Sequence, residues 1–129
     1  MRLTCLMVLT LTMAQAAKDE AIKHFQAAKK IVDTWAGRLA LGRAYLAANA
    51  FAEADTELDA CQKRRGEATA MFLDESPTYR VFPPVYYYLG VAREGLKSPG
   101  AAESYKSFLA TQKGDANPLV ADAKKRLGG

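Results

Sequence analysis

Apolar residues recur at intervals of three and four along most of this chain, the spacing that places them on one face of an α-helix. No stretch shows the strict alternation of apolar and polar residues that a half-buried strand requires. We therefore predict an all-α fold. The predicted helices cover residues 19–32, 35–48, 52–74, 84–95, 101–111 and 118–127.

Short polar residues mark the helix boundaries in the first half of the chain. Asp33 or Thr34 is expected to cap the helix that starts at Trp35, because a short side-chain oxygen accepts a hydrogen bond from an unpaired backbone N–H in the first turn. Asn49 and Ala50 are expected to form the next turn. These boundaries predict two helices joined by a short connection.

The second helix of this pair is expected to be long. Its apolar stripe continues with the same spacing on both sides of Gly66, as far as Phe72. We predict one helix through residue 74, with a kink at Gly66 as the alternative, since glycine inside a helix costs about 1 kcal/mol relative to alanine. Prolines then exclude regular helix from residues 76–83, and Pro84 is expected to open the next helix.

The first sixteen residues allow two interpretations. The apolar run Leu3–Met13 is too short to span a bilayer, but the small residues of Ala14-Gln15-Ala16 follow it at the spacing that signal peptidase accepts. In one interpretation the segment is an export signal and the mature protein is exported or periplasmic. In the other it is the first helix of a hairpin whose second helix begins near Lys18, and the protein is cytoplasmic.

Two pairs of predicted helices share a residue pattern. The first pair carries Leu41-Gly42-x-x-Tyr45 and then Ala54-x-x-x-Leu58-x-x-Cys61, and the second carries Leu89-Gly90 and then Ala101-x-x-x-Tyr105-x-x-Phe108. The glycine and the alanine are expected to let the helices of a pair approach closely, while larger residues fill the space between pairs. Ala21-x-x-x-Phe25-x-x-Ala28 matches the second helix of an earlier pair, which favours a helical role for Leu3–Ala16.

This pattern resembles the tetratricopeptide repeat (TPR), a helical hairpin that stacks into open arrays. The second copy departs from the repeat, because Arg93 stands where a tyrosine is expected. Residues 63–68 and 82–90 are similar to the C-terminal TPR segment of large bacterial multidomain signalling proteins, including some serine/threonine kinases. The resemblance covers about residues 21–109 and implies an interaction or regulatory module.

The resemblance implies one domain over residues 1–129, built as a TPR-like stack of antiparallel helical hairpins with a C-terminal capping helix. The expected parts are a first hairpin (or a signal peptide and one helix) in 1–33, a central hairpin in 34–75, a proline loop in 76–83, a third hairpin in 84–111 and the capping helix in 118–127. The last helix has a basic outer side, which suits the closed end of a stack.

Stacks of this kind hold extended peptides or protein tails in the groove formed by the first helices of the hairpins. Here those helices begin at Trp35 and Pro84. We expect Arg38, Arg43 and Tyr87 to line the groove, with Tyr87 as the exposed member of a run of three tyrosines that cannot all face inward. Arg38 has an alternative, because it stands where the repeat has a large apolar residue and would then lie along the hairpin.

Charge narrows the choice of partner. The 129 residues include 18 Lys or Arg and 14 Asp or Glu, a net charge of +4, but the cations fall in small groups such as residues 63–65. A basic nucleic-acid-binding helical protein is therefore a weaker alternative than a protein that binds a peptide or another protein. An exported envelope scaffold and self-association are further alternatives.

The chain offers little material for catalysis. His24 has no neighbouring cysteine or second histidine, and Cys5 and Cys61 are the only cysteines, so we expect no metal site, no cofactor and no disulfide framework. The chain also contains no Gly-rich phosphate loop and no Asp-Phe-Gly motif. We therefore expect a binding protein that is not an enzyme.

Overall fold

The computed structural model describes residues 2–72 and 82–128, with side chains described for 7–68 and 82–128. Both ranges are helical and contain no strand, which confirms the predicted all-α class. The helices are α1 (Arg2–Ile31), α2 (Trp35–Ala47), α3 (Phe51–Lys63), α4 (Arg65–Phe72), α5 (Val85–Gly95), α6 (Gly100–Thr111) and α7 (Pro118–Gly128).

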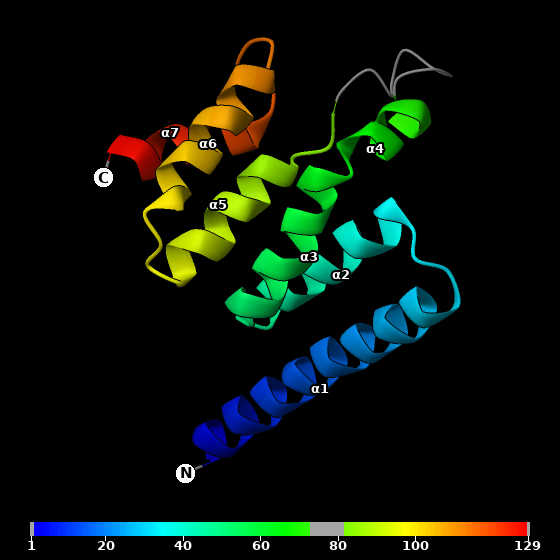
Figure 1. Ribbon diagram of the computed structural model, residues 1–129. Helices are drawn as coiled ribbons and strands as arrows, with labels where there is room; N and C mark the ends of the chain where they lie inside the picture. The colour runs from blue at the N-terminus through cyan, green and yellow to red at the C-terminus, as the bar shows by residue number, and fades with distance from the viewer. Residues whose placement is uncertain (1, 73–81, 129) are drawn as a thin grey trace.

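Helices α2 and α3 form one antiparallel hairpin, and α5 and α6 form another (Figure 1). The second helix of the first hairpin, α3, packs against the first helix of the next, α5, while α1 lies along α2 and α7 closes against α6. Thr34 caps α2 by accepting a hydrogen bond from the N–H of Gly37 at 3.0 Å. Asn49, in the turn between α2 and α3, adopts the left-handed conformation that asparagine tolerates well.

The apolar core follows the two hairpins. One group of buried side chains lies between the first hairpin and α5, and it contains Trp35, Ala54, Leu58, Cys61, Ala68, Val85, Leu89 and Ala92. A second group lies between α5, α6 and α7, and it contains Tyr87, Tyr105, Phe108, Val120 and Ala123. Helix α5 contributes to both groups, so it is covered on two sides.

Glycines set the distance between the helices of each hairpin. A Cβ atom added to Gly42 would lie 2.8 Å from Cγ of Leu58, and one added to Gly90 would lie 2.5 Å from the ring of Tyr105. Both approaches are closer than real Cβ atoms allow, so the close packing expected from the repeated pattern is confirmed. Gly95 makes a further close approach, to the ring of Phe51, that the sequence analysis did not anticipate.

The uninterrupted helix predicted through residue 74 is wrong, because the helix breaks at Arg64 between α3 and α4. The break lies two residues from Gly66, where the sequence analysis placed the alternative kink. The indole Nε1–H of Trp35 donates to the carbonyl of Cys61 at 2.9 Å. In an uninterrupted helix that carbonyl would accept from residue 65. A side chain that enters the backbone ladder in this way is a recognised cause of a kink, and the flexible Gly66 lies beside it.

The hairpin that one of the two interpretations places in residues 1–33 is also wrong, because Arg2–Ile31 form the single helix α1. The segment around Ala14–Lys18 contains strong helix formers and neither glycine nor proline, so nothing favours a turn there. The hydroxyls of Thr10 and Thr12 donate to carbonyls within the helix and do not interrupt it. The predicted proline loop and the end of the long helix fall largely on residues 73–81, outside the described residues.

The N-terminal half of α1 packs against no other described element. Every described side chain from Met7 to Glu20 is exposed. In the following segment the motif Ala21-x-x-x-Phe25-x-x-Ala28 is mostly exposed, with Ala21 half-buried and Phe25 37% exposed, so it lacks the cover that the matching residues of α3 and α6 have. Over the described residues, no helix combines the length and the hydropathy that crossing a membrane requires.

Substituting Gly90 by alanine is expected to destabilise the protein by about 1–3 kcal/mol, because the added methyl meets the buried Tyr105 ring. Gly66→Ala is the matched control. Its Cβ has open space, so the better helix propensity of alanine should stabilise the protein by up to about 1 kcal/mol. The free energy of unfolding of each variant is measured by urea titration. A change of the same sign in both variants would contradict the packing described.

Candidate partner-binding face

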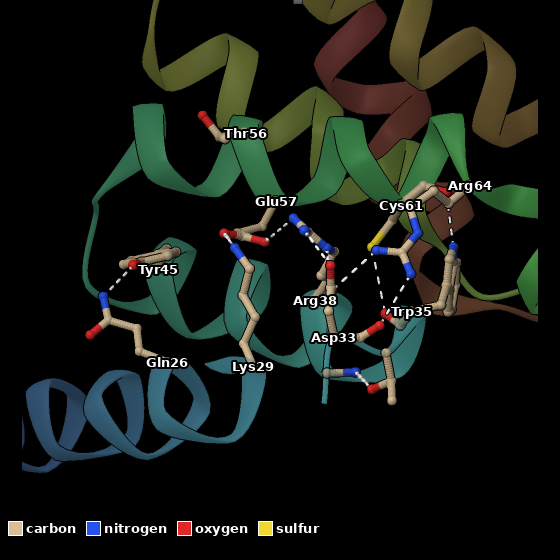
Figure 2. Close-up of polar contacts among 12 residues, drawn as sticks. Gln26, Lys29, Asp33, Trp35, Arg38, Tyr45, Thr56, Glu57, Cys61 and Arg64 are labelled. Atoms are coloured by element: carbon tan, nitrogen blue, oxygen red, sulfur yellow. Dashed lines mark hydrogen bonds and ion pairs between the residues drawn. The ribbon is translucent and has the colours of Figure 1, made fainter. Parts of the chain in front are cut away.

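Arg38 belongs to a polar network that joins three elements, not to an open groove. Its guanidinium pairs with Asp33, Nε to Oδ1 at 2.6 Å and Nη2 to Oδ2 at 2.7 Å, and donates from Nη1 to Glu57 at 3.0 Å. Figure 2 shows Arg38 between these two carboxylates. Its side chain is 18% exposed. The structure therefore places it along the hairpin, the alternative that the sequence analysis left open.

The carboxylate of Glu57 is the buried centre of this network. Its side chain is only 8% exposed, and it accepts hydrogen bonds from Lys29 of α1 at 2.5 Å and from Arg38 of α2. A buried carboxylate needs such partners, because the loss of hydration would otherwise cost several kcal/mol. The pairing ties α1, α2 and α3 together at one point.

Asp33, at the end of α1, is held by two arginines. Arg64 adds a contact of 3.1 Å to the bidentate pair that Arg38 makes. The hydrogen bond from Arg38, reinforced by Arg64, lowers the pKa of Asp33 from 3.8 to about 2. Arg64 also pairs with Glu67 of α4, so the kinked end of α3 is tied to the α1–α2 connection.

Arg43 differs from four other arginines of the described residues. These four, Arg38, Arg64, Arg93 and Arg126, each bridge two carboxylates. The exposed guanidinium of Arg43 lies instead over the ring of Tyr88, with 5.2 Å between Cζ and the ring centroid. Among the described residues it makes no ion pair. This cation–π contact joins α2 to α5.

Tyr87 is not at the surface, so its predicted place in the groove is wrong. It is 8% exposed and packs against Tyr105 and Phe108. Its hydroxyl donates to Asp122 of α7 at 2.6 Å. Burial, together with this carboxylate, raises the pKa of Tyr87 to about 12. The periodicity of α5 alone does not reveal this, because α6 covers a second side of that helix.

The α2–α5 face therefore contains one predicted residue, Arg43, and one that the sequence analysis missed, Tyr88. The spacing of Val85, Leu89 and Ala92 defines the side of α5 that faces α3, and Tyr88 falls on its flank. That signal marks Tyr88 as half-buried, which is the burial observed. It does not show which element of the neighbouring hairpin the ring meets.

Several hollows border these elements, among them one of about 400 Å³ that is lined by residues of α1, α2 and α3. A space of about 310 Å³ between α1 and α2 is lined by Phe25, Ala40, Arg43 and Ala44. A larger one of about 580 Å³ is lined by Lys63, Arg65, Gly66, Phe82, Tyr86 and Thr111. Within the described part of the chain, no group of three or more His, Cys, Asp or Glu residues lies close enough to hold a metal ion.

The remaining candidate groups have structural explanations. His24 is exposed and lies 3.4 Å from Glu20 on its own helix, as expected for a solvated histidine. Cys61 is fully buried, which confirms its predicted place in the core. Burial raises the pKa of its thiol to about 12, so the group stays protonated at neutral pH.

The Asp33 contacts predict an acid-dependent contribution to stability. Because the folded pKa is about 2 and the ordinary value is 3.8, the contribution is present above pH 4 and is lost as pH falls towards 2. Asp33→Asn should therefore destabilise the protein at pH 6 and have little effect near pH 2, measured by urea unfolding. Thr34→Ala, which removes a cap with no titrating group, should cost about 1 kcal/mol at both pH values. An Asp33→Asn effect that does not change with pH would contradict this account.

Comparison with known proteins adds no relative to this description. No protein-family model matches the chain, and neither the curated proteins nor the solved structures contain a significant match. The functional argument therefore depends on the residues and contacts of the chain itself.

Proposed function

We propose that this chain is a non-catalytic protein-binding module, an adaptor or scaffold, built as a TPR-like stack of hairpins. Three features support the proposal. Two consecutive antiparallel hairpins pack second helix to first helix, the same glycine contact recurs inside each, and α7 covers the last hairpin. In such a stack the first helices, here α2 and α5, share one face on which an extended peptide binds.

The exposed Arg43 over Tyr88 is the observation that carries this proposal. A guanidinium held over an aromatic ring is already partly oriented, so it loses less side-chain entropy when it binds a carboxylate. The other four bridging arginines have their charges satisfied inside the chain, whereas Arg43 keeps its hydrogen-bond donors open to solvent. The arrangement suits a peptide that places an acidic group on Arg43.

The same observation weakens the nucleic-acid alternative. A protein that binds phosphate backbones needs several unpaired cations on one surface. Here Arg64, Arg93 and Arg126 are each paired with carboxylates, so these three cations are not available to bind a phosphate backbone. We therefore favour a protein or peptide partner.

An array of 12-residue peptides with acidic, neutral and basic C-terminal ends tests this proposal, with affinities of the selected peptides measured by fluorescence polarisation. Acidic peptides should be selected, and Arg43→Ala should weaken their binding by about tenfold or more. Arg43→Lys should give an intermediate loss, because it keeps the charge but not the forked hydrogen-bond donors of the guanidinium. Lys125→Ala, which removes one exposed charge from α7, is the matched control.

Two results would contradict the proposal. One is the selection of no peptide. The other is an equal effect of the Arg43 and Lys125 variants on peptide affinity, since this would mean that binding depends only on the net charge of the protein. A 20-base-pair DNA duplex in the same assay, with a steep salt dependence, would instead support the basic nucleic-acid-binding alternative.

A further inference from the structure

The same helix motif occurs three times in this chain, and only one copy is uncovered. Ala54-x-x-x-Leu58-x-x-Cys61 in α3 is fully buried. In α6, Tyr105 and Phe108 are buried beside a half-buried Ala101. In α1 the equivalent positions are a half-buried Ala21, Phe25 at 37% exposure and an exposed Ala28.

What covers the motif in α3 and α6 is the first helix of the same hairpin. There, a residue without a side chain faces the large central residue of the motif: Gly42 faces Leu58, and Gly90 faces Tyr105. Helix α1 lacks such a helix among the described residues. Its motif meets the hollow lined by Phe25, Ala40, Arg43 and Ala44, which is open beside the neighbouring α2.

The chain nevertheless contains a segment suited to this place. Residues 3–17 form fifteen consecutive uncharged helical positions, a length similar to that of α2 and α5. The segment is exposed on all described sides, although it carries five large apolar side chains of the kind that a folded protein normally buries: Met7, Val8, Leu9, Leu11 and Met13. It cannot fold back onto its own motif, because α1 runs straight through residues 14–18 (Figure 1).

We propose that a second copy of this chain supplies the missing helix, and that the two α1 helices pair antiparallel in a reciprocal, domain-swapped dimer. Each N-terminal half then covers the motif of the other copy. This exchange of identical elements is a low-cost route to a two-fold symmetric dimer. Two chains together then form the antiparallel helix pair that a single chain does not form.

The residue sizes along α1 fit this pairing. A stripe with alternating steps of four and three runs along the helix through Met7, Leu11, Ala14, Lys18, Ala21, Phe25, Ala28 and Val32. Antiparallel pairing about the middle of the stripe places Ala14 opposite Phe25 of the second copy, and Leu11 opposite Ala28. Small residues thus face large ones, as the glycines do in the two hairpins.

The area of the contact indicates its strength. Thirty helical residues extend about 45 Å, and a helix is about 11 Å wide, so the strip covers roughly 500 Å² per copy and roughly 1,000 Å² in all. This is at the lower limit for a specific interface, so a dimer of micromolar affinity is expected. Lys18 is the charged member of the stripe, and its replacement by leucine should tighten the dimer.

Sedimentation equilibrium of the 129-residue chain, from about 1 to about 100 µM, tests the proposal. The mass should rise with concentration towards 28 kDa, twice the 14.0 kDa of one chain. Ala14→Glu should raise the dissociation constant by about tenfold or more, because it buries a carboxylate at the seam. Ala16→Glu, the same change at an exposed position on the opposite side of α1, should leave it within about twofold.

A size exchange tests the register. Ala14→Phe and Phe25→Ala should each weaken the dimer, the first by a clash of rings and the second by a cavity, whereas the double variant should recover most of the loss. Far-UV circular dichroism verifies that each variant keeps its helix content. A monomer at all concentrations would overturn the proposal, as would a dimer that Ala14→Glu and Ala16→Glu affect equally.

Discussion

The buried carboxylate of Glu57 is the constraint on which the arrangement of the first three helices depends. It lies on the inner side of α3, between positions that belong to the apolar core, and it needs cationic partners there. Lys29 supplies one from α1, and Arg38 supplies the other from α2. Lys29, together with the hydrogen bond from Gln26 to the hydroxyl of Tyr45, positions α1 against the hairpin by polar contacts. The apolar residues of α1 remain available for another surface.

Three further arginines also connect separate elements by pairing with carboxylates. Arg64 ties α3 and α4 to the α1–α2 connection, Arg93 ties α5 to α3, and Arg126 ties α7 to α5. Each bridges two carboxylates, so each fixes the place of one element against another by geometry as well as by charge. These pairs are partly exposed, so each contributes modestly to stability. Their larger effect is on function, because they remove charge from the surface and leave Arg43 as a distinct feature of the α2–α5 face.

The two proposed surfaces meet at the hollow lined by Phe25 and Arg43, but they have different chemistry. The α2–α5 face presents an oriented cation to an acidic ligand, whereas the N-terminal half of α1 presents an uncharged helix to a second copy. A reciprocal α1 pair would border the hollow next to Arg43. Dimerisation would then set one edge of the peptide-binding face and place two such faces in one assembly, which favours bivalent partners.

Local periodicity determined most of the elements of this protein. The spacing of apolar residues, the cap at Thr34 and the turns at Asn49 and after Gly95 predicted α2, α5, α6 and α7 to within one or two residues. The repeated glycine positions also predicted which helices approach closely, because two helices can come closer where one of them has no side chain at the contact. These features depend on neighbours in the sequence.

Only the tertiary structure decided the features that depend on distant residues. The break at Arg64 follows from Trp35, 26 residues from the Cys61 carbonyl that it contacts. Tyr87 is buried because Tyr105 and Phe108 of α6 cover a second side of α5, and its hydroxyl finds an acceptor in Asp122 of α7. Arg38 lies along the hairpin because it pairs with the buried carboxylate of Glu57. The exposure of Phe25 also depends on a distant element, because the motif is buried only where the first helix of a hairpin packs against it. A helix pattern specifies an apolar face, but the neighbour that covers this face is set by packing across the whole chain.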